Sequence, residues 1–349
     1  MNIVDAFCNT HSHLREGDVV PDLVQKSYDG GADVLLPMPN TAEGLITRDG
    51  VIKYIDELKQ AASNLSMGFI PTLMINEETD VDEVFKCVNA GICDAKIYPL
   101  DRTTKSHNGV RDYVKLLSLI KYCGKVGMRV HFHPEHPWML FSNRDAEYAF
   151  LPIVDMFLRQ TNATIIWEHG TDARCIPFWK EMARTGRFFV TLTAHHLLTD
   201  EDEVFGDVRS VCKPSIKTKG DQQSLVALVA EDFRWVMAGA DDAPHDIVNK
   251  HVHEGKCACG AYTAPFALQL YAHALDSILS IGERGYEVFT KFTSRNARFG
   301  LYNLAPTSRR FELSPEPFQI PGHYKIGSWV VEPFWANQIL KYSLNEVIE

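Results

Sequence analysis

The sequence lacks long apolar runs, an export signal and any excess of basic residues. No run approaches the roughly 18 apolar residues that a membrane-spanning helix needs. The first residues, MNIVDAFCNTHSH, contain neither the basic nor the apolar segment of a signal peptide. Lysine and arginine number 35 against 45 aspartates and glutamates, a net charge of −10, and no basic patch is present. These absences argue against a membrane protein, an exported protein and a nucleic-acid-binding protein.

Cysteine is also sparse. Eight cysteines are scattered through 349 residues. Without an export signal they predict reduced thiols in the cytoplasm rather than a disulfide framework. Hydrophobic residues make up 45% of the chain and charged residues 23%, which is typical of a globular protein with a large core. The negative net charge does not exclude an anionic small molecule as substrate, because one local arginine outweighs distant charges.

Eight short apolar runs recur along the chain, each nearly continuous, as in strands that are covered on both faces. Segments with helical periodicity separate them, and strand alternating with helix predicts parallel pairing. Eight such units in about 250 residues favour a closed (β/α)8 barrel over an open, doubly wound sheet. No G-x-G-x-x-G follows the first run, which argues against a dinucleotide-binding sheet. The runs are Ile3–Asn9, Ala32–Pro39, Ser66–Met74, Cys93–Pro99, Met128–His133, Ala163–His169, Phe188–Ala194 and Phe233–Asp241.

One of the predicted helices shows how its ends are specified. Asp80 is expected to begin it, because an aspartate side chain can accept hydrogen bonds from the first free amides. The spacing of Val84, Phe85 and Val88 predicts that these three side chains point inward. Gly91 is expected to end the helix.

The pattern changes after about Asn303, where prolines punctuate two short strand-like pieces, Phe318–Ile320 and Ser328–Val331. We therefore interpret residues 1–305 as the barrel and residues 306–349 as a C-terminal extension that packs on it.

Polar residues interrupt the apolar runs at their C-terminal ends, the edge that carries the active site in a (β/α)8 barrel. A single histidine at such a position is more often a core residue, but several together predict a functional site. The residues are His11, His13, Asn40, Lys96, His131, His133, His169 and Asp241.

His11 and His13 can bind one metal ion, because residues two apart in an extended segment point to the same side. Imidazole suits zinc and similar divalent metals. Lys96 lies within an apolar run, where burial would lower its pKa. A neutral amine can add carbon dioxide to form a carbamate, whose two oxygens could bridge two metals.

His131 and His169 would then bind the second metal. His133 shares a strand face with His131, so spacing alone leaves both open. Asp241 could bind metal and shuttle a proton, although either it or Asp242 could instead cap a helix.

Taken in order, these motifs resemble the short, bacterial type of the dihydroorotase family, within the amidohydrolase superfamily. The resemblance runs from about residue 5 to about residue 305. The matching motifs are His11-Ser12-His13-Leu14-Arg15, Met38-Pro39-Asn40-Thr41, Lys96-Ile97-Tyr98-Pro99, Trp167-Glu168-His169 and Gly239 to His245.

The resemblance implies two Zn²⁺ ions and the reversible cyclisation of N-carbamoyl-L-aspartate to (S)-dihydroorotate, a step of pyrimidine synthesis. It implies that His11, His13 and Asp241 hold the first zinc, with Asp241 also the catalytic proton shuttle. His131 and His169 would hold the second, and N6-carboxylated Lys96 would bridge both. The residues that it implies in substrate binding are Arg15, Asn40, Thr103, Thr104, Lys213, His245 and Gly260.

The chain departs from the family pattern at three points. The fifth run reads His131-Phe132-His133 where the family commonly has His-Gly-Glu, and the spacing to Arg144-Asp145 favours His131 as the ligand. Lys213 stands where an apolar residue is usual, and Gly260 where alanine is usual. These changes bear on substrate choice.

Several other functions use similar barrels. Hydantoinases and allantoinases carry a β-sandwich built from both chain ends. Here the metal motif begins at His11, so too few residues precede it to form the N-terminal half of such a sandwich. Lactonases and phosphotriesterases share the metals, but Arg15 and Asn40 favour an anionic ring as substrate. An inactive scaffold barrel is disfavoured, because every expected metal ligand is present in the sequence and a scaffold would not need them.

Two further clusters are interpreted as structural: Cys257-Ala258-Cys259, a weak thiolate pattern, and His195-His196, a pair at the rim or in the core. We expect a cytoplasmic homodimer that acts on a small anionic substrate and binds neither nucleic acid nor membranes.

Overall fold

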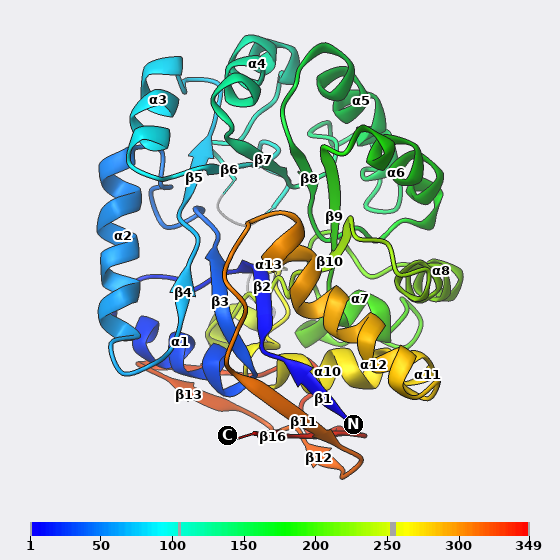
Figure 1. Ribbon diagram of the computed structural model, residues 1–349. Helices are drawn as coiled ribbons and strands as arrows, with labels where there is room; N and C mark the ends of the chain where they lie inside the picture. The colour runs from blue at the N-terminus through cyan, green and yellow to red at the C-terminus, as the bar shows by residue number, and fades with distance from the viewer. Residues whose placement is uncertain (1, 104–105, 252–255, 348–349) are drawn as a thin grey trace.

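The computed structural model describes residues 2–103, 106–251 and 256–347. Short parallel strands form a barrel with helices around it (Figure 1). One sheet has the order β2-β3-β4 and the other the order β10-β9-β8-β7-β6-β5. The barrel strands are β2 (Phe7–Ser12), β3 (Ala32–Pro37), β4 (Gly68–Phe69), β5 (Thr72–Ile75), β6 (Asp94–Ile97), β7 (Arg129–Phe132), β8 (Ile165–Trp167), β9 (Phe188–Leu192) and β10 (Val236–Ala238).

The barrel closes where the segment after β10 meets β2. The Asp241 amide donates to the His11 carbonyl over 3.0 Å, and the His13 amide donates to the Asp242 carbonyl over 3.0 Å. These bonds place the residues that follow β10 beside the C-terminal end of β2. The predicted closed barrel of parallel strands is the fold observed.

Two of the eight predicted runs are divided in the structure. Ile3–Asp5 forms a separate strand, β1, which leaves the barrel and pairs antiparallel with the tail. The third run is split into β4 and β5 around Pro71, which has no amide hydrogen to donate to a neighbouring strand.

Thirteen α-helices are described, and those that follow the strands cover the outside of the barrel (Figure 1). They are α1 (Val20–Asp29), α2 (Arg48–Ala61), α3 (Val81–Asn89), α4 (Leu117–Val126), α5 (Leu151–Gln160), α6 (Ile176–Met182), α7 (Ala194–Leu198), α8 (Lys219–Ala230), α9 (Ile247–Lys250), α10 (Ala267–Ala274), α11 (Asp276–Leu279), α12 (Glu283–Thr290) and α13 (Asn296–Gly300).

Helix α3 begins as predicted, because the Asp80 side chain accepts a hydrogen bond from the Glu83 amide over 2.8 Å. Val84 and Cys87 are its buried residues. The prediction that Phe85 points inward is wrong, since Phe85 is 52% exposed. One residue turns a helix by about 100°, which carries Phe85 off the face that Val84 and Cys87 share.

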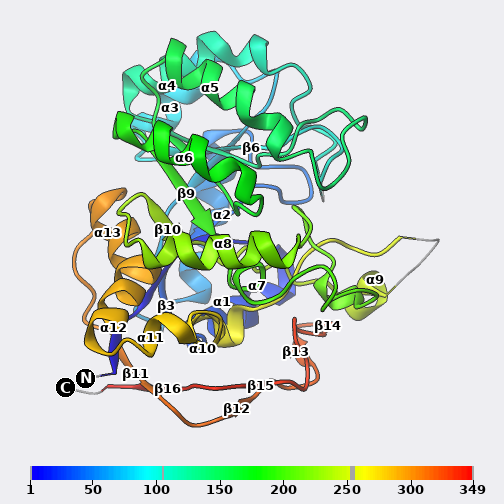
Figure 2. The same cartoon turned by 90° about the vertical axis from the view of Figure 1, so that its right-hand side faces the viewer.

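The C-terminal tail lies along one end of the molecule, next to α10, α11 and α12 (Figure 2). Its strands are β11 (Arg310–Ser314), β12 (Phe318–Gln319), β13 (Tyr324–Ile326), β14 (Trp329–Val331), β15 (Ile339–Leu340) and β16 (Ser343–Glu346). Strand β11 pairs antiparallel with both β1 and β16, so the two chain ends lie close together. The division of the chain at residue 305 stays an interpretation.

Candidate active site

Polar side chains meet at the C-terminal edge of the barrel, where (β/α)8 enzymes hold their active sites. His11 lies in β2 and Lys96 in β6, while His169 follows β8 and Asp241 follows β10. These four side chains are buried, and His13, just after β2, is partly buried. The structure therefore brings together five residues that are up to 230 positions apart in the sequence.

Two imidazoles converge on one carboxylate oxygen. Oδ1 of Asp241 lies 3.2 Å from Nε2 of His11 and 3.0 Å from Nε2 of His13. His169 joins the group, because ligand atoms of His11, His169 and Asp241 all lie within 4.8 Å of one another. Burial raises the pKa of Asp241, but His11 and His13 outweigh burial and hold it well below its usual value. An ionised carboxylate among imidazoles is a donor set that suits a divalent metal.

Glu168 and Asn40 orient these imidazoles. Oε2 of Glu168 lies 3.0 Å from Nδ1 of His11, and Oδ1 of Asn40 lies 2.9 Å from Nδ1 of His13. Glu168 also accepts a hydrogen bond from the Thr191 hydroxyl over 2.6 Å. With Nδ1 held in this way, each ring presents Nε2 to the centre, as metal-binding histidines usually do.

Lys96 is fully buried, and among the described residues its Nζ has no hydrogen-bond partner. Burial lowers the pKa of this amine to about 8, although Glu168 and Asp241 act in the opposite direction. An unpaired ammonium would be costly in such a place. At neutral pH a larger share of this lysine than of an ordinary one is therefore the neutral amine that carbamate formation requires.

His131 is occupied on both ring nitrogens. Nδ1 lies 2.5 Å from Oε1 of Glu168, and Nε2 lies 3.0 Å from Oδ1 of Asp94. Asp94 is itself held by Arg129, whose Nε and Nη2 donate to its two oxygens over 2.8 and 2.6 Å. In this arrangement both nitrogens of His131 face carboxylates, and its role as a ligand of the second metal stays a prediction.

His133 lies nearer to the centre. Its ring centroid is 4.6 Å from that of His169. Its Nε2 lies 2.7 Å from Oε2 of Glu135, a fully buried carboxylate.

The backbone is strained at this edge. Arg15, His169 and Asp241 have φ angles of 56°, 39° and 47°, in the left-handed region that residues other than glycine rarely adopt. Strained residues that cluster in one place are typical of functional sites.

Next to the metal-type ligands, most of the predicted substrate-binding residues line one pocket. Its lining consists of His13, Arg15, Asn40, Thr103, Lys213, Asp241, Ala243, Cys259 and Gly260. The guanidinium of Arg15 is anchored, because Nε donates to the Pro244 carbonyl over 3.0 Å. Nη2 of Arg15 lies 3.2 Å from Nε2 of His245. Thr104 lies outside the described residues.

No family model matches the chain. It is 30% identical to the dihydroorotase of Aliivibrio salmonicida over 344 residues, which cover 95% of this chain and 96% of that one. It is 29% identical to the dihydroorotase of Shewanella amazonensis over 345 residues, with 96% of each chain covered.

Among solved structures, the dihydroorotase of Saccharomyces cerevisiae in complex with 5-fluoroorotic acid superposes with a TM-score of 0.91 at 26% identity, over 99% of each chain. The chain belongs to the dihydroorotase family. It is therefore a hydrolase of cyclic amides, and the predicted fold, family and activity are confirmed.

A hydantoinase, one of the rival functions, shares the fold of this chain. The L-hydantoinase of Arthrobacter aurescens also superposes, with a TM-score of 0.81, over 98% of this chain and 84% of that one. At 12% identity that likeness shows only the shared fold.

Gly260 differs from the residue expected in a dihydroorotase for a physical reason. Its φ is 154°, and a Cβ added there would lie 2.6 Å from both the Cβ and the carbonyl oxygen of Ala243. Alanine therefore does not fit at this position. The preceding residue, Cys259, also lines the pocket.

Lys213 also departs from the dihydroorotase pattern. Its Nζ donates a short hydrogen bond to Oδ1 of Asn143, in the loop that follows β7. The lysine thus ties two loops at the mouth of the pocket.

Several residues that support this dihydroorotase site were not singled out from the sequence. Asp94, Glu135 and Lys250 are buried charged residues. Lys250 donates to the carbonyls of Val211 and Gly260 over 2.9 and 2.7 Å, which joins two loops of the pocket. Asp94 could have been found from the sequence, because it is a charged residue within the apolar fourth run.

The two remaining clusters differ in whether they form a metal-type group. His195 and His196 are buried, as a core pair should be, and form a second metal-type group with Cys212. The pair Cys257 and Cys259 belongs to no such group among the described residues.

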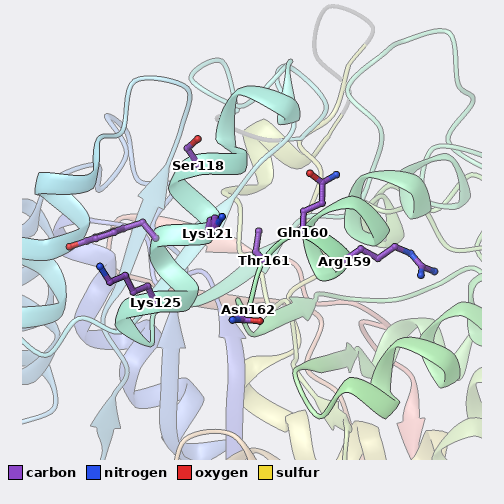
Figure 3. Close-up of a pocket in the computed structure, with 8 residues that line it drawn as sticks. Ser118, Lys121, Lys125, Arg159, Gln160, Thr161 and Asn162 are labelled. Carbon is purple, nitrogen blue, oxygen red and sulfur yellow. The ribbon is translucent and has the colours of Figure 1, made fainter.

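A separate hollow of about 560 Å³ lies elsewhere. Figure 3 shows that its side chains come from α4, from the C-terminal end of α5 and from the two residues that follow α5, on the outside of the barrel. Because α5 leads into the start of β8, this end of the hollow lies near the opposite edge from the active site. Within the described chain, no helix combines the length and apolar character needed to cross a bilayer.

Proposed function

We propose that the chain interconverts N-carbamoyl-L-aspartate and (S)-dihydroorotate at a binuclear zinc site, with the named residues in the roles that follow. One observation carries the proposal: a buried, anchored guanidinium, Arg15, lines the same pocket as His13 and Asp241. An anion-binding group beside a metal-type centre fits a cyclic amide that bears a carboxylate.

The donor set fits two metals. His11, His13 and Asp241 converge with separations near 3 Å and would hold the first. His169 would bind the second, and its buried Nδ1 has no hydrogen-bond partner in the described structure. Lys96, equally unpaired, would bridge the two as an N6-carboxylated side chain. Zinc ions bound there would polarise the ring amide carbonyl and lower the pKa of the attacking water.

Asp241 would move the proton. Both short contacts to histidine involve its Oδ1, which leaves Oδ2 to accept the proton of the attacking water. The low pKa of this carboxyl group keeps it ionised at neutral pH. In hydrolysis Asp241 would then deliver the proton to the ring nitrogen, and in cyclisation the same transfer would run in reverse.

Arg15, Asn40 and His245 would hold the substrate carboxylate. A guanidinium can donate two parallel hydrogen bonds to a carboxylate. His245 would act as a neutral ring, because burial, followed by the charge of Arg15, lowers its pKa to about 2. The ligand named for the yeast relative, 5-fluoroorotic acid, is also a ring with a carboxylate, which supports this assignment.

Thr103, Thr104, Lys213 and Gly260 would contribute the remaining contacts to the ring. No disulfide joins any of the eight cysteines, all of which lie among the described residues, and this supports the proposed cytoplasmic location. The homodimer stays a prediction.

The test is turnover by purified, zinc-loaded protein. Dihydroorotate hydrolysis should exceed hydrolysis of dihydrouracil, the same ring without the carboxylate, by at least two orders of magnitude. Carbamoyl-aspartate should cyclise at low pH. Equal turnover of both rings, or turnover of neither, would contradict the proposal.

A further inference from the structure

A second group of metal-type side chains shares no residue with the proposed binuclear centre. His195 and His196 lie in the first turn of α7, which follows β9, and Cys212 lies between α7 and α8. All three are buried, and one ligand atom from each lies within 4.8 Å of the others. Imidazole and thiolate are the side-chain groups that bind zinc in structural sites. These three residues are called the α7 cluster below.

His196 and Cys212 both point at one backbone oxygen. Nε2 of His196 lies 3.0 Å from the carbonyl oxygen of Pro214, and the Cys212 thiol donates to the same oxygen over 3.3 Å. Nε2 and Sγ are 3.6 Å apart. The other nitrogen of the ring, Nδ1, lies 2.6 Å from the Thr193 hydroxyl, which holds the ring as a partner of a ligating histidine does. A cation that replaced the two hydrogens would meet a nitrogen, a sulfur and an oxygen donor.

The His195 ring has no hydrogen bond of its own. Its side chain is fully buried, and neither ring nitrogen has a hydrogen-bond partner in the described structure. Burial of polar atoms without hydrogen bonds is costly, and ligation of a metal ion would offset that cost. The ring centroid lies 4.3 Å from that of His196. His195 can therefore add another nitrogen donor to the three that His196, Cys212 and Pro214 supply.

Burial also sets the protonation state of the α7 cluster. It lowers the pKa of His195 to about 4 and that of His196 well below its usual value, so both rings are neutral at pH 7, the form that binds metal. It raises the pKa of the Cys212 thiol to about 12, but a bound cation deprotonates a coordinating thiol. Metal binding at neutral pH would thus release the thiol proton to solvent.

A path leads to the cluster from solvent. Cys212 lines a hollow of about 490 Å³, whose wall also includes the exposed residues Glu201 and Gly206. Lys213, the residue next to the thiol, lines both this hollow and the substrate pocket. A metal ion can therefore reach the thiol from outside, and a metal held there would lie next to a residue of the pocket wall.

We propose that the α7 cluster, with the Pro214 carbonyl as fourth donor, is a structural zinc site. Four protein donors leave no open position for a substrate, as in structural rather than catalytic zinc sites. The ion would link α7 to the loop that carries Lys213. The site goes beyond the proposed function and does not depend on it, because none of its donors belongs to the binuclear centre.

Cobalt(II) can report this site directly, because a cobalt–thiolate bond absorbs in the near ultraviolet and no proposed ligand of the binuclear centre contains sulfur. Reduced, metal-free protein of full length is titrated with cobalt(II), and absorption and bound cobalt are measured. The wild type should show the thiolate band. Cys212→Ser should lose the band and bind one equivalent fewer. Cys257→Ser and Cys259→Ser alter the other thiols that line these two hollows; they are the matched controls and should keep both.

Loss of an imidazole provides a second test if Cys212→Ser does not fold. His195→Phe replaces one flat ring by another and removes two buried nitrogens that have no hydrogen bond in the described structure, so the metal-free variant is expected to fold. Its affinity for the cobalt that gives the thiolate band should fall by more than the roughly 10–100-fold that loss of an outer partner costs.

Three results would overturn the proposal: no thiolate band in the wild type, a band that survives in Cys212→Ser or disappears in Cys257→Ser, or unchanged cobalt affinity in His195→Phe. Failure of the proposed function would be distinct. It would appear as wild-type protein that does not turn over dihydroorotate, and it would leave the thiolate band in place.

Discussion

Replacing Arg15 by methionine should separate substrate recognition from metal binding. Methionine fills most of the space of the buried arginine stem but cannot pair with a carboxylate. Loss of one partner of a buried charge pair costs about 2–5 kcal/mol. We expect a value near 3 kcal/mol, because Asn40 and His245 would still contact the carboxylate and the pocket opens to solvent. At about 1.4 kcal/mol per decade, kcat/KM for dihydroorotate should fall roughly 100-fold.

The assay compares two substrates and one further variant. Hydrolysis of dihydrouracil, which has no carboxylate, should change less than about threefold in Arg15→Met, since no pairing is lost. Arg15→Lys keeps the charge but not the planar pair of donors, so its loss should be intermediate. Bound zinc should stay at the wild-type value in both variants. Wild-type KM and kcat for dihydroorotate in Arg15→Met would refute the role given to this residue.

Four further outcomes follow from the same geometry. Lys96→Ala should lose the bridged metal pair and most activity, with partial rescue by short carboxylic acids; full activity would leave the lysine a structural role only. Because the pKa of Lys96 is about 8 and only the neutral amine adds carbon dioxide, activation of metal-free protein by zinc at a fixed concentration of dissolved carbon dioxide should slow about tenfold per pH unit well below 8. A pH-independent rate would contradict this. Asp241→Asn should lose at least about a hundredfold in kcat while elemental analysis finds most of its metal; near-normal kcat would remove Asp241 from proton transfer. Gly260→Ala should lower the free energy of unfolding, measured with denaturant, by about 1–3 kcal/mol and should raise KM. The control, Gly206→Ala, is also at positive φ but has nothing within 4 Å of the added Cβ, so its KM should stay unchanged. Equal KM in the two variants would argue against the close contact at Ala243.

The residues at the strand ends could be predicted from the sequence because the period of a strand and the polarity of a barrel are general properties. His11, Lys96, His169 and Asp241 each stand next to an apolar run, and the fold then brings them together. Arg15 could be placed in the substrate pocket only through the resemblance to a family, since it neither lies within a run nor directly follows one.

The surroundings of His131 and His133 could not be predicted from spacing. They depend on which acids meet each ring, and Asp94, Glu135 and Glu168 come from different segments of the chain. The division of the first run is a similar case. Ile3–Asp5 is as apolar as the strand that follows it, but it lies outside the barrel because it pairs with β11. Such outcomes depend on contacts between distant residues, which periodicity does not encode.

The proposed first metal site lies across the junction where the barrel closes, so metal binding there should affect the stability of the barrel. His11 and His13 belong to the first barrel strand and its following residues, and Asp241 follows the last, so their carboxylate–imidazole contacts cross the junction where the barrel closes. A metal held by these three residues would bind the closed barrel and not an open one, and binding to one state stabilises that state. Loss of metal should therefore first loosen the contact between β2 and the segment after β10, and amide hydrogen exchange at Asp241 and His13 would report it. For this chain, loading of the metal would therefore reinforce the junction at which the barrel closes.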